Sequence, residues 1–425
     1  MYNIDPYLNH NECASIFNYA GIYMILDVNS PLPNESINQD DPSSSYDSAY
    51  LNRTFAILDN FREFPNTLGF FSANELINAD SNTGDAPYIR AVTRDLKQYM
   101  QARGGRQVPV GYSAADVRDI LTDTSNYVQC TIGGTTSADY INGGRSDFFG
   151  LNSYSWCGDA TFVSSTYNQL AADFANTTIP VFFSEYGCNN PYPRTFTEVA
   201  ALYGPQMTTW SGGLGQSSNT QCKRRDANCN VVYEWTQESN NYGLVNVNSD
   251  GSLTILQDYV NLQGQYNMLN LTRLESANAS AVALTPPTCG ADLISNNSTF
   301  PTSFDLPTQP PGVASLITSG APGASVGTTV SVTATGLSIN VTPVSGAVTS
   351  TLSITQAKSA NVPGGASGSA TATAAVTSAR ASGSGSATSS ASASATHKGA
   401  AANVEPRGNA VFGVGIAAIF MWLLG

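Results

Sequence analysis

The sequence has few charged residues and almost no histidine, and both shortages limit its chemistry. Only 12% of the 425 residues are charged, and the formal net charge is −13. An acidic chain without a basic stripe has no electrostatic reason to bind nucleic acid, so no such partner is expected. The histidines are His10 and His397 alone, which leaves almost nothing for a Ser-His-Asp triad or a histidine metal site. Carboxylate chemistry remains, and we expect neither a cofactor nor a metal.

No cysteine lies in a CxxC pair, which argues against a zinc ribbon or a thioredoxin-like motif. The chain has many Asn-x-Ser/Thr sequons, a density that fits exposure to the secretory pathway, where disulfides form. The cysteine number is odd, so one is expected to lack a partner. The cysteines are Cys13, Cys130, Cys157, Cys188, Cys222, Cys229 and Cys289. The sequons begin at Asn34, Asn52, Asn176, Asn270, Asn278, Asn296, Asn297 and Asn340.

The two ends of the chain carry different targeting signals. The first residues show neither a basic start nor an apolar run, so no signal peptide is expected there. An apolar stretch runs from Ala410 to Gly425 after small residues and a short polar segment, which is typical of a glycosylphosphatidylinositol (GPI) attachment signal. A tail-anchoring helix is the alternative, but it usually needs about 20 apolar residues. The candidate attachment residues are Gly399, Ala400 and Asn403.

The composition divides the chain into three parts. Residues 1–290 contain the apolar runs of a folded domain. Residues 291–398 are rich in Ser, Thr, Ala, Gly and Pro, so they are expected to form a disordered, O-glycosylated stalk. Residues 399–425 are the GPI signal with its hydrophobic tail.

Two apolar runs end abruptly in glutamate. Residues 181–185 and 67–75 both read as strands buried on both faces, and they end at Glu185 and Glu75. Glutamate is rarely buried without a partner, and the carboxyl ends of parallel strands are where barrel enzymes place their chemistry. Two facing carboxylates are the minimum apparatus for retaining cleavage of a glycosidic bond. Taken singly, Glu75 could instead cap the following helix and Glu185 could be an ion-paired residue at the barrel end.

Strands and helices alternate along the chain as far as residue 235, which favours a parallel α/β fold of the (β/α)₈ type. The predicted strands are residues 22–27, 67–75, 108–112, 147–154 and 181–185, with a last one around Trp210 and 231–235. The predicted helices are residues 11–19 (with Asn11 as cap and Gly21 as stop), 50–64, 86–102, 164–174 and 194–203.

Six motifs occur together and in order. They are Ile37-Asn38-x-Asp40-Asp41-Pro42, Asn74-Glu75, Asn152-x-Tyr154-x-Trp156-Cys157, Phe183-Ser184-Glu185-Tyr186-Gly187-Cys188, Trp210-Ser211-Gly212-Gly213 and Asn240-Asn241-Tyr242-Gly243-Leu244-Val245. In this the chain resembles the fungal β-1,3-glucanosyltransferases of glycoside hydrolase family 72, cell-wall enzymes with a GPI anchor. The resemblance runs from Tyr2 to Val245, and more loosely to Cys289.

The resemblance implies a retaining transglycosylase that cuts within one β-1,3-glucan chain and passes the new reducing end to another. Glu75 matches the acid/base and Glu185 the nucleophile, for which the hydroxyls of Tyr154, Tyr186 and Tyr233 are candidate donors. The implied partners are glucan donor and acceptor chains and the outer leaflet of the plasma membrane. The sugar-binding candidates are Tyr2, Asn38, Asp41, Asn74, Tyr154 and Tyr233, with Tyr112 and Tyr242 as further stacking candidates. The implied disulfides are Cys157–Cys188 and Cys130–Cys289.

Two departures from the family pattern bear on activity. Family members have a first barrel strand, a helix and most of a second strand before the position of Tyr2, so the barrel is expected to be incomplete at its N-terminus. Residues 215–230 interrupt the last strand, and Cys222 with Cys229 would close them into a loop. A plain endo-β-1,3-glucanase and a non-catalytic anchored wall glycoprotein are therefore the alternative functions.

Overall fold

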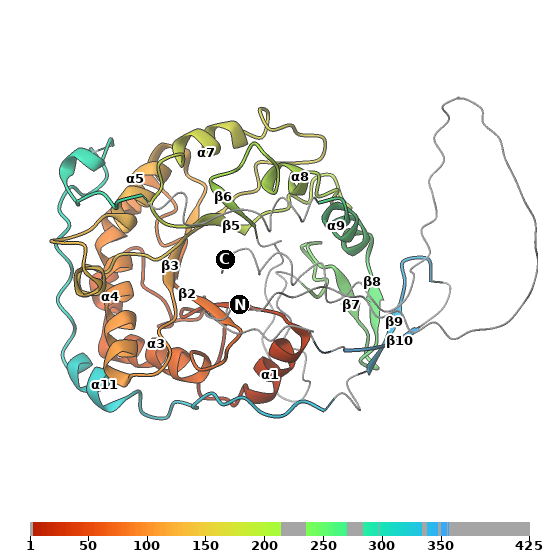
Figure 1. Cartoon of the computed structure of the whole chain (residues 1–425), viewed down its shortest axis with the longest axis horizontal. Helices are drawn as coiled ribbons and strands as arrows, with labels where there is room; N and C mark the ends of the chain where they lie inside the picture. Colours follow the sequence, from red (N-terminus) through yellow and green to blue (C-terminus); the bar gives the residue numbers. More distant parts are fainter. Residues whose placement is uncertain are drawn as a thin grey trace, which may run out of the picture.

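The computed structural model describes residues 3–213, 235–269, 284–296, 298–333, 338–346, 350–354 and 356. Its centre is a six-stranded parallel sheet with the order β1-β2-β3-β4-β5-β6 (Figure 1). Each strand is followed by its neighbour in both sequence and space, which is the topology of a (β/α) barrel wall. The strands are β1 Met24–Asp27, β2 Thr67–Asn74, β3 Val110–Ala115, β4 Phe149–Asn152, β5 Val181–Glu185 and β6 Trp210–Gly213.

Helices connect these strands and cover the outer face of the sheet (Figure 1). The predicted alternation is confirmed, and α5 and α6 are additional helices that periodicity missed. Helix α1 ends before Gly21, as predicted, and Gly21 adopts a left-handed conformation with φ +78°. The N-cap of α1 is His10 and not the predicted Asn11. The helices are α1 Asn11–Ala20, α2 Pro42–Ser45, α3 Ser48–Phe61, α4 Ala86–Arg103, α5 Arg118–Gln129, α6 Ser137–Asn142, α7 Tyr167–Asp173 and α8 Glu198–Leu202, with a 3₁₀ turn, η1, at Asp80–Asp85.

The sheet is buried on both faces, as its unbroken apolar strands predicted. Alternate residues point to opposite faces. Met24, Leu26 and Phe183 belong to the large core shared with the helices. The other face carries a separate cluster, in which Phe148 lies over Gly69 and Gly111. A Cβ atom at Gly69 would lie 2.8 Å from the Phe148 ring, so these glycines are required by packing. The whole cluster is Tyr23, Ile25, Leu68, Phe71, Phe148 and Phe182.

A second, smaller sheet has the order β10-β9-β8-β7 and lies beside the barrel (Figure 1). Strands β7 (Val245–Val247) and β8 (Leu253–Ile255) form an antiparallel pair, and helix α9 (Gln257–Asn267) follows them. Strand β9 (Ser338–Thr342) pairs in parallel with β8 and antiparallel with β10 (Ser350–Ser353). Residues far apart in the sequence therefore complete this sheet.

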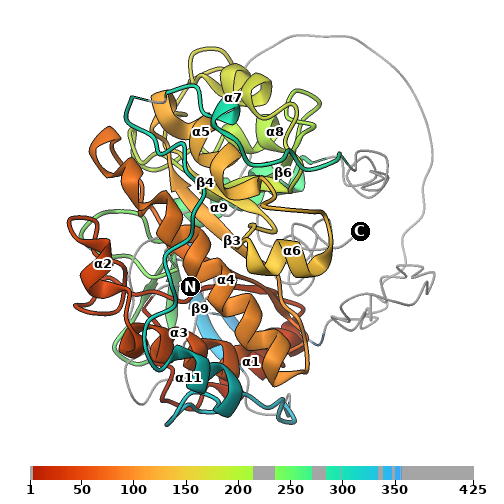
Figure 2. The ribbon, with the colours of Figure 1, turned by 90° about the vertical axis from the view of Figure 1, so that its left-hand side faces the viewer.

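Residues 284–296 and 298–333, here called the strap, run across the outside of helices α5, α4 and α3 (Figure 2). Asp123 of α5 accepts hydrogen bonds from the backbone N–H groups of Ser295 and Asn296. Farther along, the strap forms helix α11 (Val313–Ser319), which packs on α3 and α4. Near the end of the strap, the Gly327 N–H donates to the Asp59 carbonyl. The strap also contains a 3₁₀ turn, η3, at Ala291–Leu293.

The strap corrects the prediction that disorder begins at residue 291. Phe304 stacks on Tyr127 with ring centroids 4.5 Å apart, and Phe300 packs on the same ring. Arg94 donates to the Pro307 carbonyl at 2.9 Å. Much of the strap is held by backbone groups that bond to neighbouring helices, so its order does not require a composition rich in apolar residues.

Several predicted features lie outside the described residues. Among the residues that the structure does describe, no helix is long and apolar enough to cross a membrane. The predicted features outside them are Tyr2, Tyr233, Cys222, Cys229, residues 357–398 of the stalk, and the GPI signal with Gly399, Ala400 and Asn403.

Candidate active site

Glu75 follows directly after β2, at the carboxyl edge of the parallel sheet. Its backbone has φ +49°, a conformation that is uncommon for residues other than glycine. The Glu75 N–H donates to the Ser113 carbonyl at 2.8 Å, and the Gln39 side chain donates to the Glu75 carbonyl at 3.0 Å. Its Oε1 accepts a 2.8 Å hydrogen bond from Asn152 Nδ2. The turn therefore presents a partly exposed carboxylate that is held from both sides.

Glu185 is the last residue of β5 and is buried, with 5% of its surface exposed. Tyr154 OH donates to Glu185 Oε2 at 2.6 Å. A hydroxyl that donates to a carboxylate favours its ionised form. The predicted contact with Tyr154 is confirmed. The Tyr186 hydroxyl, another predicted donor, instead meets Tyr266 at 2.6 Å in the core.

Asn152 relates the strand end that carries Glu185 to the Glu75 carboxylate. It ends β4 and is paired in register with Glu185 on β5, while its side chain reaches Glu75 beyond β2. Asn74 is also in this group, because its Oδ1 accepts from Asn152 Nδ2 at 3.1 Å. The Asn152 side chain thus bonds to Glu75 and its backbone pairs with Glu185, so both glutamates lie at the carboxyl edge of the sheet, as the two glutamate-ended strands predicted.

A disulfide closes the loops beyond β4 and β5. Cys157 lies three residues after Tyr154, and Cys188 lies three residues after Glu185. Their S–S bond is 2.02 Å long, which confirms the pairing implied by the family resemblance. The disulfide therefore ties the segment that contains Tyr154, the hydroxyl donor, to the segment that contains Glu185, the acceptor.

Tyr242 joins the second sheet region to this site. Its ring meets the Tyr154 ring edge-on, with centroids 6.2 Å apart, so Tyr242 backs the hydroxyl donor to Glu185. Arg194 donates to the Tyr242 carbonyl at 2.6 Å and forms a buried ion pair with Asp258 of α9 at 2.6 Å. Buried charges of this kind are costly unless paired, so the pair fixes α9 relative to the site.

Asn38 and Asp41 lie in an exposed loop whose contacts are mainly local. Asp41 caps α2 and accepts from Ser43 Oγ at 2.7 Å, a bond that lowers the pKa of the Asp41 carboxyl. Asn38 accepts from the Asp40 N–H. The described contacts thus give both residues a turn-forming role, and their sugar binding stays a prediction. Between them, Gln39 connects the loop to the carbonyls of Glu75 and Leu76.

Tyr112 and Asp27 lie near the same edge of the sheet but differ from what the sequence predicted. Tyr112 is fully buried and accepts from the Ile77 N–H, so it is a core residue and the prediction that it stacks on sugar is wrong. Asp27, which sequence reasoning left without a role, ends β1 at the same sheet edge. Burial raises the pKa of Asp27 to about 6, against the hydrogen bonds from Asn29. The Asn29 amide also donates to the Ser72 carbonyl, which joins β1 to β2.

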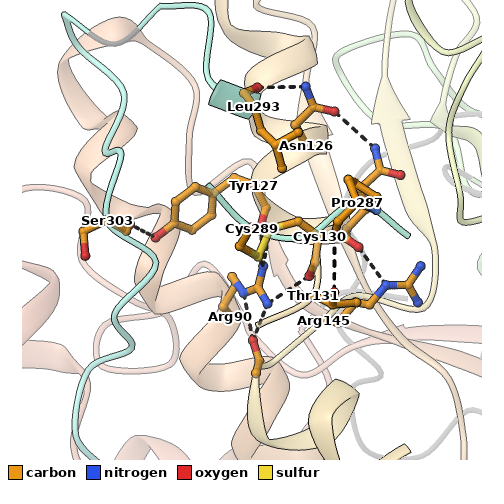
Figure 3. The surroundings of a disulfide bond; sticks show 12 residues. Arg90, Asn126, Tyr127, Cys130, Thr131, Arg145, Pro287, Cys289, Leu293 and Ser303 are labelled. Carbon is orange, nitrogen blue, oxygen red and sulfur yellow. Dashed lines mark hydrogen bonds between the residues drawn. A yellow bond between two sulfur atoms is a disulfide. The ribbon is translucent and has the colours of Figure 1, made fainter. Parts of the chain in front are cut away.

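The second implied disulfide, Cys130–Cys289, fastens the strap to the end of α5, as Figure 3 shows. Arg90 of α4 lies beneath it, fully buried, and donates to the carbonyls of Tyr127 and Gly143. Burial lowers the pKa of Arg90 to about 10. This cluster lies on the helix layer, away from the sheet edge that carries the glutamates.

In the part of the chain that the structure describes, no group of three or more His, Cys, Asp or Glu side chains is arranged to hold a metal ion. The described hydrogen-bond donors to the two carboxylates are the Asn152 amide on Glu75 and the Tyr154 hydroxyl on Glu185. Such groups orient carboxylates and bind sugar hydroxyls.

Comparison with known proteins places these observations in a family. A family model described as "Glucanosyltransferase" matches residues 1–270. The 1,3-beta-glucanosyltransferase gel2 of Aspergillus fumigatus is 46% identical over 370 residues, which cover 86% of this chain and 72% of gel2. The probable 1,3-beta-glucanosyltransferase GAS3 of Saccharomyces cerevisiae is 45% identical over 334 residues, which cover 77% of this chain and 60% of GAS3.

A solved structure shows the same fold. It is a mutant of Saccharomyces cerevisiae Gas2p in complex with laminaritetraose and laminaripentaose. The match has a TM-score of 0.59 at 32% identity and covers 73% of this chain but 61% of Gas2p, so the chain spans less than two thirds of that structure. Because the family model covers more than half of the chain and the fold agrees, the chain belongs to the glucanosyltransferase family, glycoside hydrolase family 72.

Proposed function

We propose that this protein is a retaining β-1,3-glucan transglycosylase, which cuts an internal β-1,3 linkage and transfers the new reducing end to a second glucan chain. The observation that carries the proposal is that Glu75 and Glu185 both lie at the carboxyl edge of the sheet, where the Asn152 side chain bonds to Glu75 and the Asn152 backbone pairs with Glu185. Its relatives are named 1,3-beta-glucanosyltransferases, and Gas2p binds laminarin oligosaccharides in solved structures.

The first step breaks the glycosidic bond. The Glu185 carboxylate attacks the anomeric carbon and forms an ester with the donor sugar. At the same time Glu75, protonated, gives its proton to the leaving oxygen, and the cleaved fragment departs. The Tyr154 hydroxyl donates to Oε2 of Glu185 and so fixes the orientation of the attacking carboxylate.

The second step decides between transfer and hydrolysis. Glu75 is now ionised and takes a proton from a hydroxyl of the acceptor, whose oxygen attacks the ester carbon and releases Glu185. If the acceptor is a sugar, a longer glucan results, and if it is water, the donor is only shortened. Tyr154 and Tyr242 offer two half-buried rings beside Glu185 on which a sugar can stack.

The test is incubation of the full chain with a reduced laminarioligosaccharide, followed by analysis of product sizes. Transfer gives products longer than the substrate, which hydrolysis cannot give. Glu75→Gln and Glu185→Gln are expected to abolish the longer products. Shortened products alone would make the protein an endo-β-1,3-glucanase, and no products from the wild type would support a non-catalytic wall glycoprotein.

We further propose that the protein is held by a GPI anchor at the outer leaflet of the plasma membrane and in the cell wall. The support is the C-terminal sequence pattern of small residues, polar segment and apolar tail. Phosphatidylinositol-specific phospholipase C is expected to release the protein from intact cells. Retention after complete digestion of a known GPI-anchored marker would contradict the proposal.

A further inference from the structure

We propose that Asn152 is the positioning residue of the acid/base, which holds one carboxylate oxygen of Glu75 so that the other faces the leaving oxygen. The inference rests on the proposed function, because it assigns Asn152 a part in the same reaction. The sequence motif contains Asn152, but spacing alone does not show what its side chain does.

Both polar atoms of the Asn152 side chain have hydrogen-bond partners. Its Nδ2 donates to Glu75 Oε1 at 2.8 Å and to Asn74 Oδ1 at 3.1 Å. Its Oδ1 is 3.0 Å from Ser113 Oγ and 2.7 Å from Ser184 Oγ, and both hydroxyls donate to it. The two serine hydroxyls are themselves 2.7 Å apart. An amide with partners on both ends cannot turn without losing several hydrogen bonds at once.

The position of Asn152 is also fixed by the backbone. It is the last residue of β4, is 3% exposed, and lies in register with Glu185 of β5. Ser184, which holds its oxygen, is the residue before Glu185. The hydrogen bonds of Ser184 and Asn152 therefore couple the position of Glu75 to that of β5, the strand that carries Glu185.

Chemistry explains why Glu75 needs such a partner. An acid/base gives up a proton in the first step and takes one in the second, and only one of its oxygens meets the substrate. The amide N–H can donate to Oε1 but cannot accept a proton from it. It therefore directs the exchanged proton to Oε2, and it restricts rotation of a side chain that is only partly buried. Small errors of placement at this point cost large factors in rate.

The experiment compares two donors with the full chain. One is a reduced laminarioligosaccharide, whose leaving oxygen must be protonated. The other is a dinitrophenyl β-laminaribioside, whose leaving group departs without an acid. If Asn152 positions Glu75, Asn152→Ala lowers the rate of bond cleavage on the oligosaccharide about 100-fold and on the activated donor less than about 5-fold. Equal losses on both donors would overturn the proposal.

A matched control separates positioning from packing. Asn66 is also a fully buried asparagine, and its side-chain amide donates to the carbonyls of Ala14 and Ile22 away from the glutamates. Asn66→Ala is expected to lower the melting temperature and to leave the ratio of the two donor rates unchanged. If Asn152→Ala only reproduces this behaviour, its role is structural.

A double variant provides the second readout. Because Asn152 is proposed to act through Glu75, Glu75→Ala and Glu75→Ala/Asn152→Ala should cleave the oligosaccharide at equal rates. A further loss in the double variant would contradict the inference. A wild type that cleaves both donors without transfer would overturn only the transferase proposal, whereas a wild type inactive on both donors would overturn both.

Discussion

The ends of β2 and β5 each carry a glutamate with a proposed catalytic role, and the surroundings of the two side chains differ. Glu75 is partly exposed, has a left-handed backbone, and is held by the amides of Asn152 and Gln39. Glu185 is buried inside the strand end, receives a tyrosine hydroxyl, and lies three residues before a disulfide. The same sequence pattern, an apolar strand ending in glutamate, therefore leads to two different environments.

The difference matches the two tasks. The nucleophile forms and breaks a covalent bond at one fixed place, so a buried, cross-linked strand end suits it. The acid/base exchanges its proton with two different partners and must stay open to both, so an exposed turn held by side chains suits it.

Loss of the nucleophile is expected to have the largest effect. Glu185→Gln cannot form the sugar ester, so the transfer rate should fall by at least about 10⁴-fold. The matched control is Glu198→Gln, which changes a carboxyl of α8 that is equally buried but bonded to neither glutamate. The control should keep its transfer rate within a few fold. A comparable loss in both variants would point to a folding effect.

Loss of the acid/base should be large but selective. Glu75→Ala is expected to lower glucan cleavage by about 10²- to 10⁴-fold, while the activated dinitrophenyl donor still forms the ester. Added azide should then accelerate turnover, because it attacks the ester without needing a general base. The products to measure are glycosyl azides of retained configuration. Inverted products would exclude a retaining mechanism.

Removal of one hydroxyl tests the support of Glu185. Tyr154→Phe deletes the 2.6 Å hydrogen bond and keeps the ring that meets Tyr242. A hydrogen bond to a charged group is worth about 1.5–3 kcal/mol, so the rate of ester formation should fall about 10- to 100-fold. Tyr242→Phe is the control, since its hydroxyl has no bond to Glu185 among the described contacts. Equal effects would show that the ring, and not the hydroxyl, matters.

Removal of either disulfide should lower stability, but only one of the two removals should also lower the transfer rate. Opening Cys157–Cys188 or Cys130–Cys289 with paired serine substitutions removes a cross-link and should lower the unfolding free energy by about 3–5 kcal/mol each. The bond Cys157–Cys188 ties Tyr154 to Glu185, so its loss should also lower the transfer rate several fold in the protein that remains folded. Loss of Cys130–Cys289 should leave that rate nearly unchanged. Denaturant unfolding and product analysis on the same samples check both statements.

The last prediction concerns the pH dependence of stability and leaves the transfer rate aside. Burial raises the pKa of Glu198 from its ordinary value of 4.5 to about 7. Between these values the unfolded chain has lost the proton and the folded chain still holds it, so the contribution of Glu198 to stability falls as pH rises, by about 3 kcal/mol. Glu198→Gln should therefore gain stability relative to the wild type between pH 5 and pH 7.5. A constant difference in urea unfolding across this range would contradict the assignment.

Local patterns predicted the elements that carry the site. Apolar runs ending in Glu75 and Glu185 predicted two buried strands, and Gly21 predicted the end of α1. The roles of Gln39 and Asn152 could not be predicted, because their partners lie 36 to 77 residues away and depend on strand register.

The prediction that Tyr112 stacks on sugar was wrong, because an aromatic side chain at a strand end can point to either face and Tyr112 points into the core. The strap was missed for a further reason. Its polar composition resembles a linker, and its order depends on acceptors such as Asp123 and rings such as Tyr127 in the helix layer.

The strap also determines how the domain would respond to mechanical tension. A pull on residue 356 acts first on β10 and β9, whose short ladders with each other and with β8 would separate. The pull would then remove the strap from α3, α4 and α5 until it reached Cys289. There the covalent bond to Cys130 carries the tension into the end of α5. In a protein tethered through its C-terminus, the strap would thus act as an extensible section that yields before force reaches the strands with Glu75 and Glu185.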